Sequence, residues 1–239
     1  AAVAIFPDRY PADDNAIELS TINSSLLDRD GAFWAVEGEN LRRKFQQSIR
    51  ERLATRGIQH LSVFALAPQP LLILLGTLVG DIVPCDIYQR HREPPTWNWP
   101  SAPARPSFEV HEPETRTGPA ALVLGLSATV TSDRVRSVLG PDASVWTVTV
   151  PEPHNDMMKA REQLSELRTI LRSLLNRIKA IHGQSSPLHI FPAAPVSAAV
   201  ELGRVRMPKA DTLWHIYDQV NALGGFTAAF TIPETENAN

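Results

Sequence analysis

The sequence predicts an α/β fold of two similar halves, with mostly parallel sheets flanked by helices and a pseudo-two-fold axis. Short apolar strands alternate with amphipathic helices, which is typical of parallel sheets covered by helices. The segment 61–76 also recurs 127 residues later at 188–203, where six of 16 aligned residues are identical. Such self-similarity indicates a repeated structural unit. We expect the halves to span 1–117 and 118–239, and to enclose one pocket suited to a nearly symmetric ligand.

The elements of the first half follow from apolar spacing and turn residues. Apolar residues recur every four positions from Leu41 to Leu53 and predict a helix over 40–56. Gly57 supplies its C-terminal stop. The next expected elements are a strand at 61–65, a turn at 67–70, a helix at 70–79 and a strand at 83–89. Pro70 suits the first helical turn, where its missing N–H has no intrahelical partner.

The second half repeats this order after one further strand–helix–strand unit. Leucines and isoleucines spaced three and four apart predict a long helix over 157–181 that ends at Gly183. The other expected elements are strands at 120–126, 144–150, 188–191 and 212–217, helices at 132–139 and 197–205, and a turn at 192–195. Ligands bind at the carboxyl ends of parallel strands. The loops 65–69, 127–131 and 192–197 are therefore the expected binding loops.

A proline-rich segment joins the two halves. Residues 94–119 contain seven prolines, so we expect a connector rather than a packed element. The same segment contains Trp97 and Trp99, two of the five tryptophans. Tryptophans in such a segment usually dock onto another surface.

Composition excludes several classes of protein. A formal net charge of −3 and a pI near 6.2 argue against a protein that coats duplex DNA, but not against a small anionic ligand. Cys85 is the only cysteine, which excludes an intrachain disulfide and favours a reducing cytosol. The longest apolar stretch, 71–79, is too short to span a bilayer. The chain begins with Ala1 rather than Met, as expected of a piece of a longer protein.

Motifs for metals and nucleotide cofactors are missing from the sequence. It contains no GxxxxGK[ST], GxGxxG or HExxH motif, and no histidine pair at metal-ligand spacing. We therefore expect neither a cofactor nor a metal site. The basic run at 42–44 favours a solvated helix face over a nucleic-acid surface.

One serine occupies the place of a hydrolase nucleophile. Gly125-Leu126-Ser127-Ala128-Thr129 lies between an expected strand and an expected helix, as a nucleophile elbow would. That turn requires glycine at its fifth position, and the β-branched Thr129 suits it poorly. The sequence therefore favours Ser127 as a polar loop residue over a catalytic nucleophile.

Basic and aromatic residues alternate after the strand expected at 83–89. The segment runs Tyr88-Gln89-Arg90-His91-Arg92 and is followed by Trp97 and Trp99. Arginine and histidine donate to phosphates, and aromatic rings stack on bases. The pattern fits a nucleotide pocket, and it fits equally a solvated strand end with two tryptophans packed as lids. The residues alone leave both interpretations open.

The two repeat units together resemble a SAVED domain, a sensor associated with SMODS nucleotidyltransferases and fused to various effectors. The resemblance rests on Val63-Phe64-Ala65-Leu66-Ala67-Pro68 with Leu75-Gly76, and on its counterpart from Leu188 to Pro195 with Leu202-Gly203. The later Leu213-Trp214-His215-Ile216-Tyr217 and the Arg/Trp segment add to it. The strand–proline–helix–glycine pattern occurs twice, and the resemblance extends over essentially the whole chain.

The resemblance implies two fused Rossmann-like units similar to the CARF domains of CRISPR ancillary proteins. It also implies a sensor of bacterial CBASS anti-phage defence, which acts in the cytoplasm without a membrane. Such a sensor binds a cyclic di- or trinucleotide second messenger. Binding drives self-association and activates a fused effector, such as an HNH or restriction-like nuclease, which lies outside this chain. On this interpretation the chain itself has no catalytic residue and is not an enzyme.

Sixteen residues of the three loops and the Arg/Trp segment are expected to contact the ligand. They are Leu66, Gln69, Tyr88, Arg90, His91, Arg92, Trp97, Trp99, Ser127, Ala128, Thr129, Phe191, Pro192, Ala193, Val196 and Ser197. Backbone N–H groups at helix starts near Pro70, Ser132 and Ser197 would face the phosphates. Arginine and histidine would add charge, and tyrosine or tryptophan would stack on a base.

Three other functions compete with the sensor interpretation. The main alternative is a ring nuclease that cleaves the same messenger, but the three loops hold no pair of lysines or histidines to catalyse it. The others are a hydrolase that uses Ser127 and a scaffold that assembles without a ligand.

Overall fold

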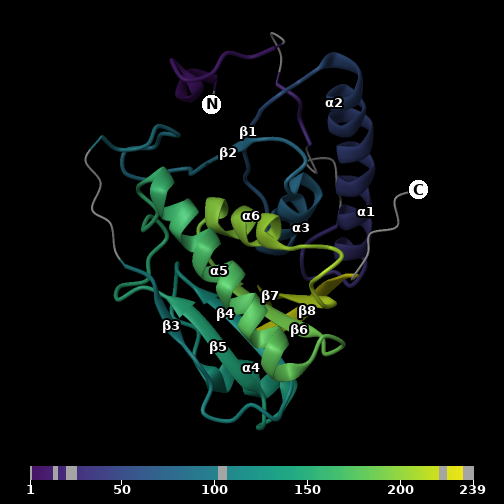
Figure 1. Ribbon diagram of the computed structural model, residues 1–239, viewed down its shortest axis with the longest axis vertical. Helices are drawn as coiled ribbons and strands as arrows, with labels where there is room; N and C mark the ends of the chain where they lie inside the picture. The colour runs from purple at the N-terminus through teal and green to yellow at the C-terminus, as the bar shows by residue number, and fades with distance from the viewer. Residues whose placement is uncertain (1, 13–15, 20–25, 102–106, 221–224, 234–239) are drawn as a thin grey trace.

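The computed structural model describes residues 2–12, 16–19, 26–101, 107–220 and 225–233. The helical segments are η1 (Ala2–Ile5), α1 (Phe33–Phe45), the π-helical η2 (Gln46–Arg50), α2 (Glu51–Arg56), α3 (Gln69–Val79), α4 (Ser132–Leu139), α5 (Arg161–His182) and α6 (Val196–Val205). The strands are β1 (Leu61–Phe64), β2 (Cys85–Tyr88), β3 (Glu109–His111), β4 (Ala120–Gly125), β5 (Ser144–Thr149), β6 (Leu188–Ala193), β7 (Trp214–Val220) and β8 (Gly225–Ile232). Figure 1 shows their arrangement.

The expected α/β fold is confirmed. In the described part of the chain, β1 and β2 form a parallel pair, and the other strands form a six-stranded sheet in the order β3-β5-β4-β6-β7-β8. The four central strands of this sheet are parallel, and the edge strands β3 and β8 are antiparallel to their neighbours. The large sheet is therefore mixed rather than purely parallel. Every residue of the central strand β4 is buried, as its continuous apolar sequence indicates.

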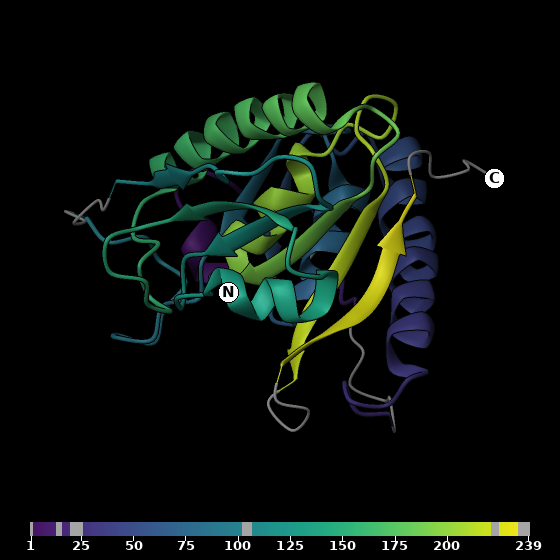
Figure 2. The ribbon, with the colours of Figure 1, turned by 90° about the horizontal axis from the view of Figure 1, so that it is seen from below.

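Helices cover both faces of the large sheet. Figure 2 shows α5 along one face and α4 on the other, with α1 beside β8. The apolar residues of α5 enter the main core, where Leu167 and Leu171 are fully buried. The carboxylate of Glu201 on α6 is also buried and is paired with Arg168 of α5 at 2.5 Å and with Arg204 at 3.2 Å. No described helix is both long and apolar enough to cross a membrane.

Several elements differ from the expectation. The first helix begins at Phe33 rather than at residue 40, because Phe33 and Trp34 bury their rings in a core cluster with α3. Strand β6 continues through Pro192 and Ala193, where a turn was expected, because both residues remain in register with β4. Strand β3 interrupts the expected connector, and β8 was not expected at all. The long helix α5 begins at Arg161 rather than at residue 157.

The internal repeat is a repeat of structure. The units β1-α3-β2 and β6-α6-β7 have the same order, and in each an aromatic pair joins the two strands. Phe64 stacks on Tyr88 with ring centroids 4.3 Å apart, and Phe191 stacks on Tyr217 at 4.4 Å. The equivalent residues therefore make equivalent contacts, as a pseudo-two-fold relation requires.

Helices α3 and α6 cross at two glycines that are equivalent in the repeat. A Cβ atom on Gly76 would lie 2.0 Å from the carbonyl oxygen of Val200, and one on Gly203 would lie 2.0 Å from that of Ile73. Val200 follows Ile73 by the same 127 residues that separate the glycines. The two backbones thus touch at the axis, and both helices lie in the middle of the molecule between the two sheets (Figure 1).

We expect Gly203→Ala to destabilise the fold, because the added methyl group would lie 2.0 Å from the carbonyl oxygen of Ile73 in the backbone of α3. Overpacking of this kind costs about 1–3 kcal/mol of unfolding free energy. Urea unfolding monitored by circular dichroism measures the change. Gly31→Ala is the matched control, since nothing lies within 4 Å of a Cβ atom there. A Gly203→Ala protein as stable as the parent would contradict the close crossing.

Candidate functional site

The carboxyl ends of the two sheets meet at one edge of the molecule. The side-chain oxygen of Gln69, at the start of α3, accepts a hydrogen bond of 2.9 Å from the N–H of Ala194. The side-chain oxygen of Gln89, just after β2, accepts bonds from the N–H and the hydroxyl of Ser197 at 3.2 and 2.7 Å. These bonds connect residues 108 and 125 positions apart. They join the start of α3 and the end of β2 to the start of α6.

The third expected loop reaches the same edge. The N–H groups of Leu126 and Ser127 donate to the carbonyl oxygen of Ala193 at 2.8 and 2.7 Å. The loop after β4 is therefore attached to the end of β6. The three loops that the sequence marks as binding loops lie together, and we call the surface that they form with the segment 89–100 the carboxyl edge.

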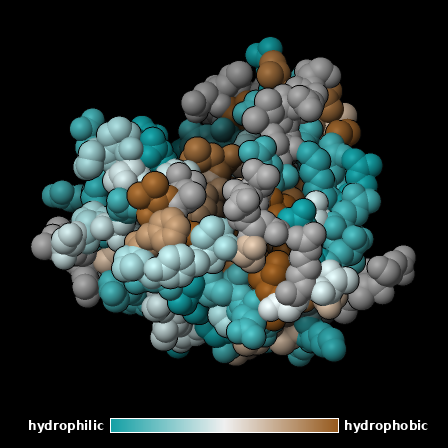
Figure 3. Space-filling model, turned by 90° about the horizontal axis from the view of Figure 1, so that it is seen from above, coloured by the Kyte–Doolittle hydropathy of each residue, from teal (hydrophilic) through white to brown (hydrophobic). Residues whose placement is uncertain are grey.

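Figure 3 shows the surface of the molecule from above the view of Figure 1. Apolar side chains gather near the centre of this face, beside a hollow. Leu66, in the loop after β1, is 66% exposed. Ala128 and Thr129, in the loop after β4, are exposed as well. The carboxyl edge therefore offers apolar contact surface to a bound molecule.

Among the described residues, three buried polar atoms at the carboxyl edge have no hydrogen-bond partner. They are the hydroxyl of Ser127, Nε2 of His91 and the indole N–H of Trp99. Burying a polar group without a hydrogen bond costs free energy, so such atoms usually meet a water molecule or a ligand. Ser127 follows β4, and the other two residues follow β2.

His91 is held by the loop that precedes α5. Its side chain is 2% exposed, and its Nδ1 lies 3.2 Å from Oδ1 of Asp156. Asp156 is also paired with Lys159. Burial lowers the pKa of His91, although the hydrogen bond to Asp156 acts in the opposite direction. Burial would raise the pKa of Asp156, but hydrogen bonds from Lys159 and His91 outweigh it and lower that pKa.

The sixteen expected ligand contacts lie in the segments of this edge or, for Tyr88 and Phe191, in the strands β2 and β6 that lead into them, but their exposure differs. Those that are exposed are Leu66, Arg92, Ala128 and Thr129. Those that are partly buried are Gln69, Arg90, Trp97, Trp99, Ser127 and Val196. Those that are buried are Tyr88, His91, Phe191, Pro192, Ala193 and Ser197. Phe191 and Tyr88 form the stacked pairs of the fold, and the Ser197 hydroxyl is bound to Gln89.

The tryptophans of the proline-rich segment dock onto the body of the protein. Trp97 packs edge-on against Phe64 with ring centroids 5.2 Å apart, and the guanidinium of Arg90 lies 5.8 Å from the Trp97 ring centroid. Trp99 packs against the main core and meets His91 edge-on at 5.5 Å. Docking was expected for both rings. Whether either also stacks on a base stays a prediction.

Gln89, Asp156 and Arg161 shape the edge but were not among the expected contacts. Arg161 donates to the Tyr88 hydroxyl at 3.1 Å, and its guanidinium lies 5.2 Å from the Tyr88 ring centroid. Gln89 is the last residue of the strand expected at 83–89, and its place at the carboxyl end of that strand could have marked it. Asp156 and Arg161 carry no local signal, because only the fold brings them to residues 65 and 73 positions away.

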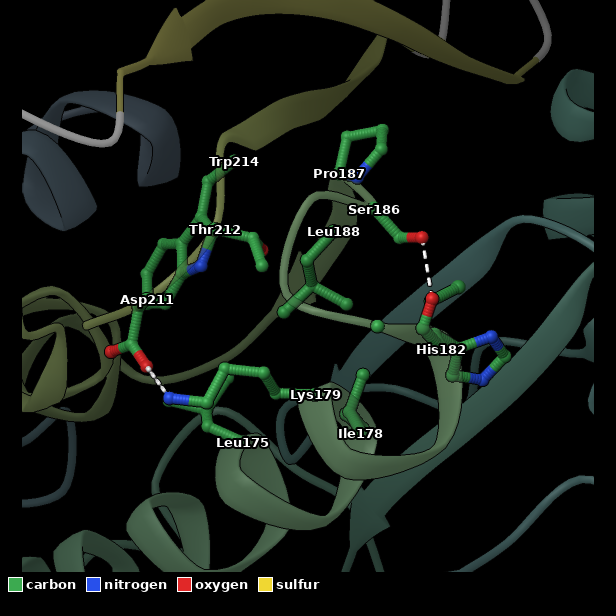
Figure 4. Close-up of a pocket in the computed structure, with 12 residues that line it drawn as sticks. Leu175, Ile178, Lys179, His182, Ser186, Pro187, Leu188, Asp211, Thr212 and Trp214 are labelled. Atoms are coloured by element: carbon green, nitrogen blue, oxygen red, sulfur yellow. Dashed lines mark hydrogen bonds and ion pairs between the residues drawn. The ribbon is translucent and has the colours of Figure 1, made fainter.

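A separate small pocket lies at the opposite end of the strands (Figure 4). It is lined by the first residues of β4, β6 and β7 and by the end of α5. Its charged groups are already engaged: Lys179 lies 3.8 Å from a carboxylate oxygen of Asp211 and donates to the carbonyl oxygen of Ala210 at 2.7 Å. Ser186 donates to the carbonyl oxygen of His182. This pocket therefore adds nothing to the carboxyl edge.

Solved structures with similar folds are bacterial receptors. The chain matches the Acinetobacter baumannii Cap4 SAVED/CARF-domain receptor bound to the cyclic trinucleotide 2'3'3'-cAAA with a TM-score of 0.57 and 16% identity, over 82% of this chain and 43% of that one. The same receptor bound to 3'3'3'-cAAA matches with a TM-score of 0.55, 15% identity and the same coverage. The Moraxella osloensis Cap4 receptor matches with a TM-score of 0.52 and 14% identity, over 82% of this chain and 42% of that one.

The chain thus spans less than half the length of these receptors, and at such identities the likeness shows the fold. No curated protein gives a significant match. The family model of the SMODS-associated and fused to various effectors sensor domain matches residues 41–232. This match covers most of the chain and both repeat units, so the protein belongs to the SAVED family of sensor domains.

Proposed function

We propose that this SAVED domain binds a cyclic di- or trinucleotide at the carboxyl edge, between halves that span 1–117 and 118–239. The observation that carries the proposal is a set of three buried polar atoms, on Ser127, His91 and Trp99, that have no hydrogen-bond partner in the described part of the chain. They lie where loops from both halves meet, which is where ligands bind in sheets of this type.

The edge has the chemistry that a cyclic nucleotide requires. The first turn of α3 can present backbone N–H groups to a phosphate, and Arg92 is exposed and can add a positive charge. Leu66 offers exposed apolar surface to a base. The Cap4 receptor of similar fold is bound to cyclic trinucleotides, which supports the same ligand class for this chain.

We further propose that binding drives self-association of the domain in the bacterial cytoplasm. The assembled sensors would activate a fused effector, such as an HNH or restriction-like nuclease, in anti-phage defence. The small share of the Cap4 receptors that this chain covers leaves room for such an effector in the whole protein. In this function the domain releases its messenger unchanged.

A thermal-shift screen against cyclic di- and trinucleotides of defined linkage tests the ligand. A messenger at a hundredfold excess over its Kd stabilises the folded state by about 2.7 kcal/mol and raises Tm. We expect one ligand or a small group of related ligands to do so. Recovery of the intact ligand after long incubation separates the sensor from a ring nuclease. No shift with any compound would contradict the proposal.

Substitutions at the carboxyl edge test the site. Ser127→Ala and Arg92→Ala each remove a hydrogen-bonding group from the site, and a lost bond to a charged partner costs about 1.5–3 kcal/mol. We expect each to weaken binding about tenfold or more in calorimetry, with unfolding unchanged. Arg50→Ala, on the exposed side of η2, is the control and should bind like the parent. If both site variants bind normally, the ligand lies elsewhere.

Sedimentation velocity with and without the ligand tests self-association. We expect the sedimentation coefficient to increase when the messenger is added. In the Arg92→Ala variant we expect no increase at the same ligand concentration. Assembly that is equally complete without ligand would instead indicate a scaffold.

A further inference from the structure

An arginine at the start of α5 connects the end of β2 to the N-terminal segment 2–12. Nη2 of Arg161 donates to the Tyr88 hydroxyl at 3.1 Å, and Nη1 lies 3.2 Å from Oδ2 of Asp8. Figure 1 shows the purple N-terminal segment at the same end of the molecule as the start of α5. Nothing in the proposed function uses Arg161 or Asp8.

The body of the protein holds one side of the Arg161 guanidinium. Tyr88 is 1% exposed and stacks on Phe64, so its hydroxyl is fixed in place. The guanidinium also lies 5.2 Å from the Tyr88 ring centroid, within reach of a cation–π contact. Arginine suits phosphate because its planar fork of N–H donors matches the oxygens of that group. The contacts with Tyr88 orient this fork, and its Nη1 arm meets the anion.

The anion that Nη1 meets in this structure is a carboxylate on a weakly held segment. Asp8 is 57% exposed, and the next residue, Arg9, lies 3.6 Å from a carboxylate oxygen of Asp86 on β2. Ion pairs as exposed as these contribute little to stability. Ile5 is buried, but three other apolar side chains of the segment are exposed, those of Val3, Phe6 and Tyr10. The segment can therefore exchange its contacts readily.

A second observation marks the start of α5 as a place for an anion. The side-chain oxygen of Gln163 accepts hydrogen bonds from the N–H groups of Lys159 and Ala160 at 2.7 and 3.0 Å, so its amide lies over the start of the helix. Its Nε2 is buried and has no hydrogen-bond partner among the described residues. An unpaired donor at the positive end of a helix dipole favours a negatively charged group nearby.

We propose that Arg161 binds a phosphate group, and that Asp8 occupies this position until a phosphate displaces it and releases the segment 2–12. The inference rests on the proposed function, in which the phosphate belongs to the cyclic nucleotide. A phosphate oxygen takes the place of the Asp8 carboxylate oxygen on Nη1, while Tyr88 keeps its bond to Nη2. Asp8 is thus a competitor within the chain, and it couples binding of the messenger to release of the N-terminal segment.

Calorimetric titration of the full chain with sodium pyrophosphate tests the position, against sodium chloride of equal ionic strength. Arg161→Gln should weaken binding at least about tenfold, because it removes a charged donor. Asp8→Asn should strengthen binding about three- to tenfold, because it removes the competitor, and it should have no effect in the Arg161→Gln background, since the two residues act on each other. Asp142→Asn, an exposed change of the same charge, is the matched control and should bind like the parent.

Trypsin cleavage after Arg9, followed by mass spectrometry, measures release of the segment. Arg161→Gln leaves the sequence around Arg9 unchanged and should be cleaved faster than the parent, because Asp8 has lost its partner. Pyrophosphate should speed cleavage of the parent but not of Arg161→Gln. Melting curves confirm that each variant is folded. Asp8→Asn changes an exposed side chain and carries the test if Arg161→Gln does not fold.

Unchanged pyrophosphate affinity in folded Asp8→Asn or Arg161→Gln overturns the proposal, and so does cleavage of the parent that pyrophosphate does not speed. Failure of the proposed function has a different signature, because no cyclic nucleotide then raises Tm while pyrophosphate still binds at Arg161. A cyclic nucleotide that stabilises the parent and the Arg161→Gln variant equally overturns the role of Arg161 alone.

Discussion

The close crossing of α3 and α6 is the constraint on which the rest of the structure depends. At Gly76 and Gly203 the two backbones touch, and a side chain on either residue would meet backbone of the other helix. Because the helices approach so closely, their N-terminal ends and the strands that feed them converge on one edge. The bonds between Gln89 and Ser197 can form only because that distance is short. The carboxyl edge is thus a product of packing at the centre of the molecule.

Much of this fold could be predicted from local pattern. Strands such as β4 are continuous apolar runs, and α5 shows apolar residues three and four apart, so both are evident in a single sequence. The elements that were missed lack such a pattern. Strand β3 is three residues long and fully exposed, and it gains its hydrogen bonds from β5. Strand β8 is stabilised by pairing with β7 and by contact of Phe230 with the cluster under α1.

In the candidate site too, some features follow from local pattern and others depend on tertiary contacts. The sequence could place the three expected loops at one edge because the rule for parallel sheets concerns topology, and the elements around these loops follow in the expected order. The burial and the hydrogen-bond partners of each side chain could not be predicted. Ser197 is fully buried because Gln89 approaches it from the other half, and His91 is fixed by Asp156 from the loop before α5. Such contacts depend on tertiary geometry, about which local residue patterns carry no information.

The hydrogen bonds of Gln69 and Gln89 break the pseudo-two-fold symmetry of the two repeat units that they join. In the repeat, Gln69 corresponds to Val196, whose side chain has no oxygen to accept the equivalent hydrogen bond. Ser197 corresponds to Pro70, which has no backbone N–H to donate. One helix start is therefore closed by a side chain of the opposite half, whereas its counterpart cannot be closed in that way. A ring of chemically identical units placed on this edge would meet different surroundings at each unit. Its units would become inequivalent on binding, and the ring would be held in one rotational register rather than several.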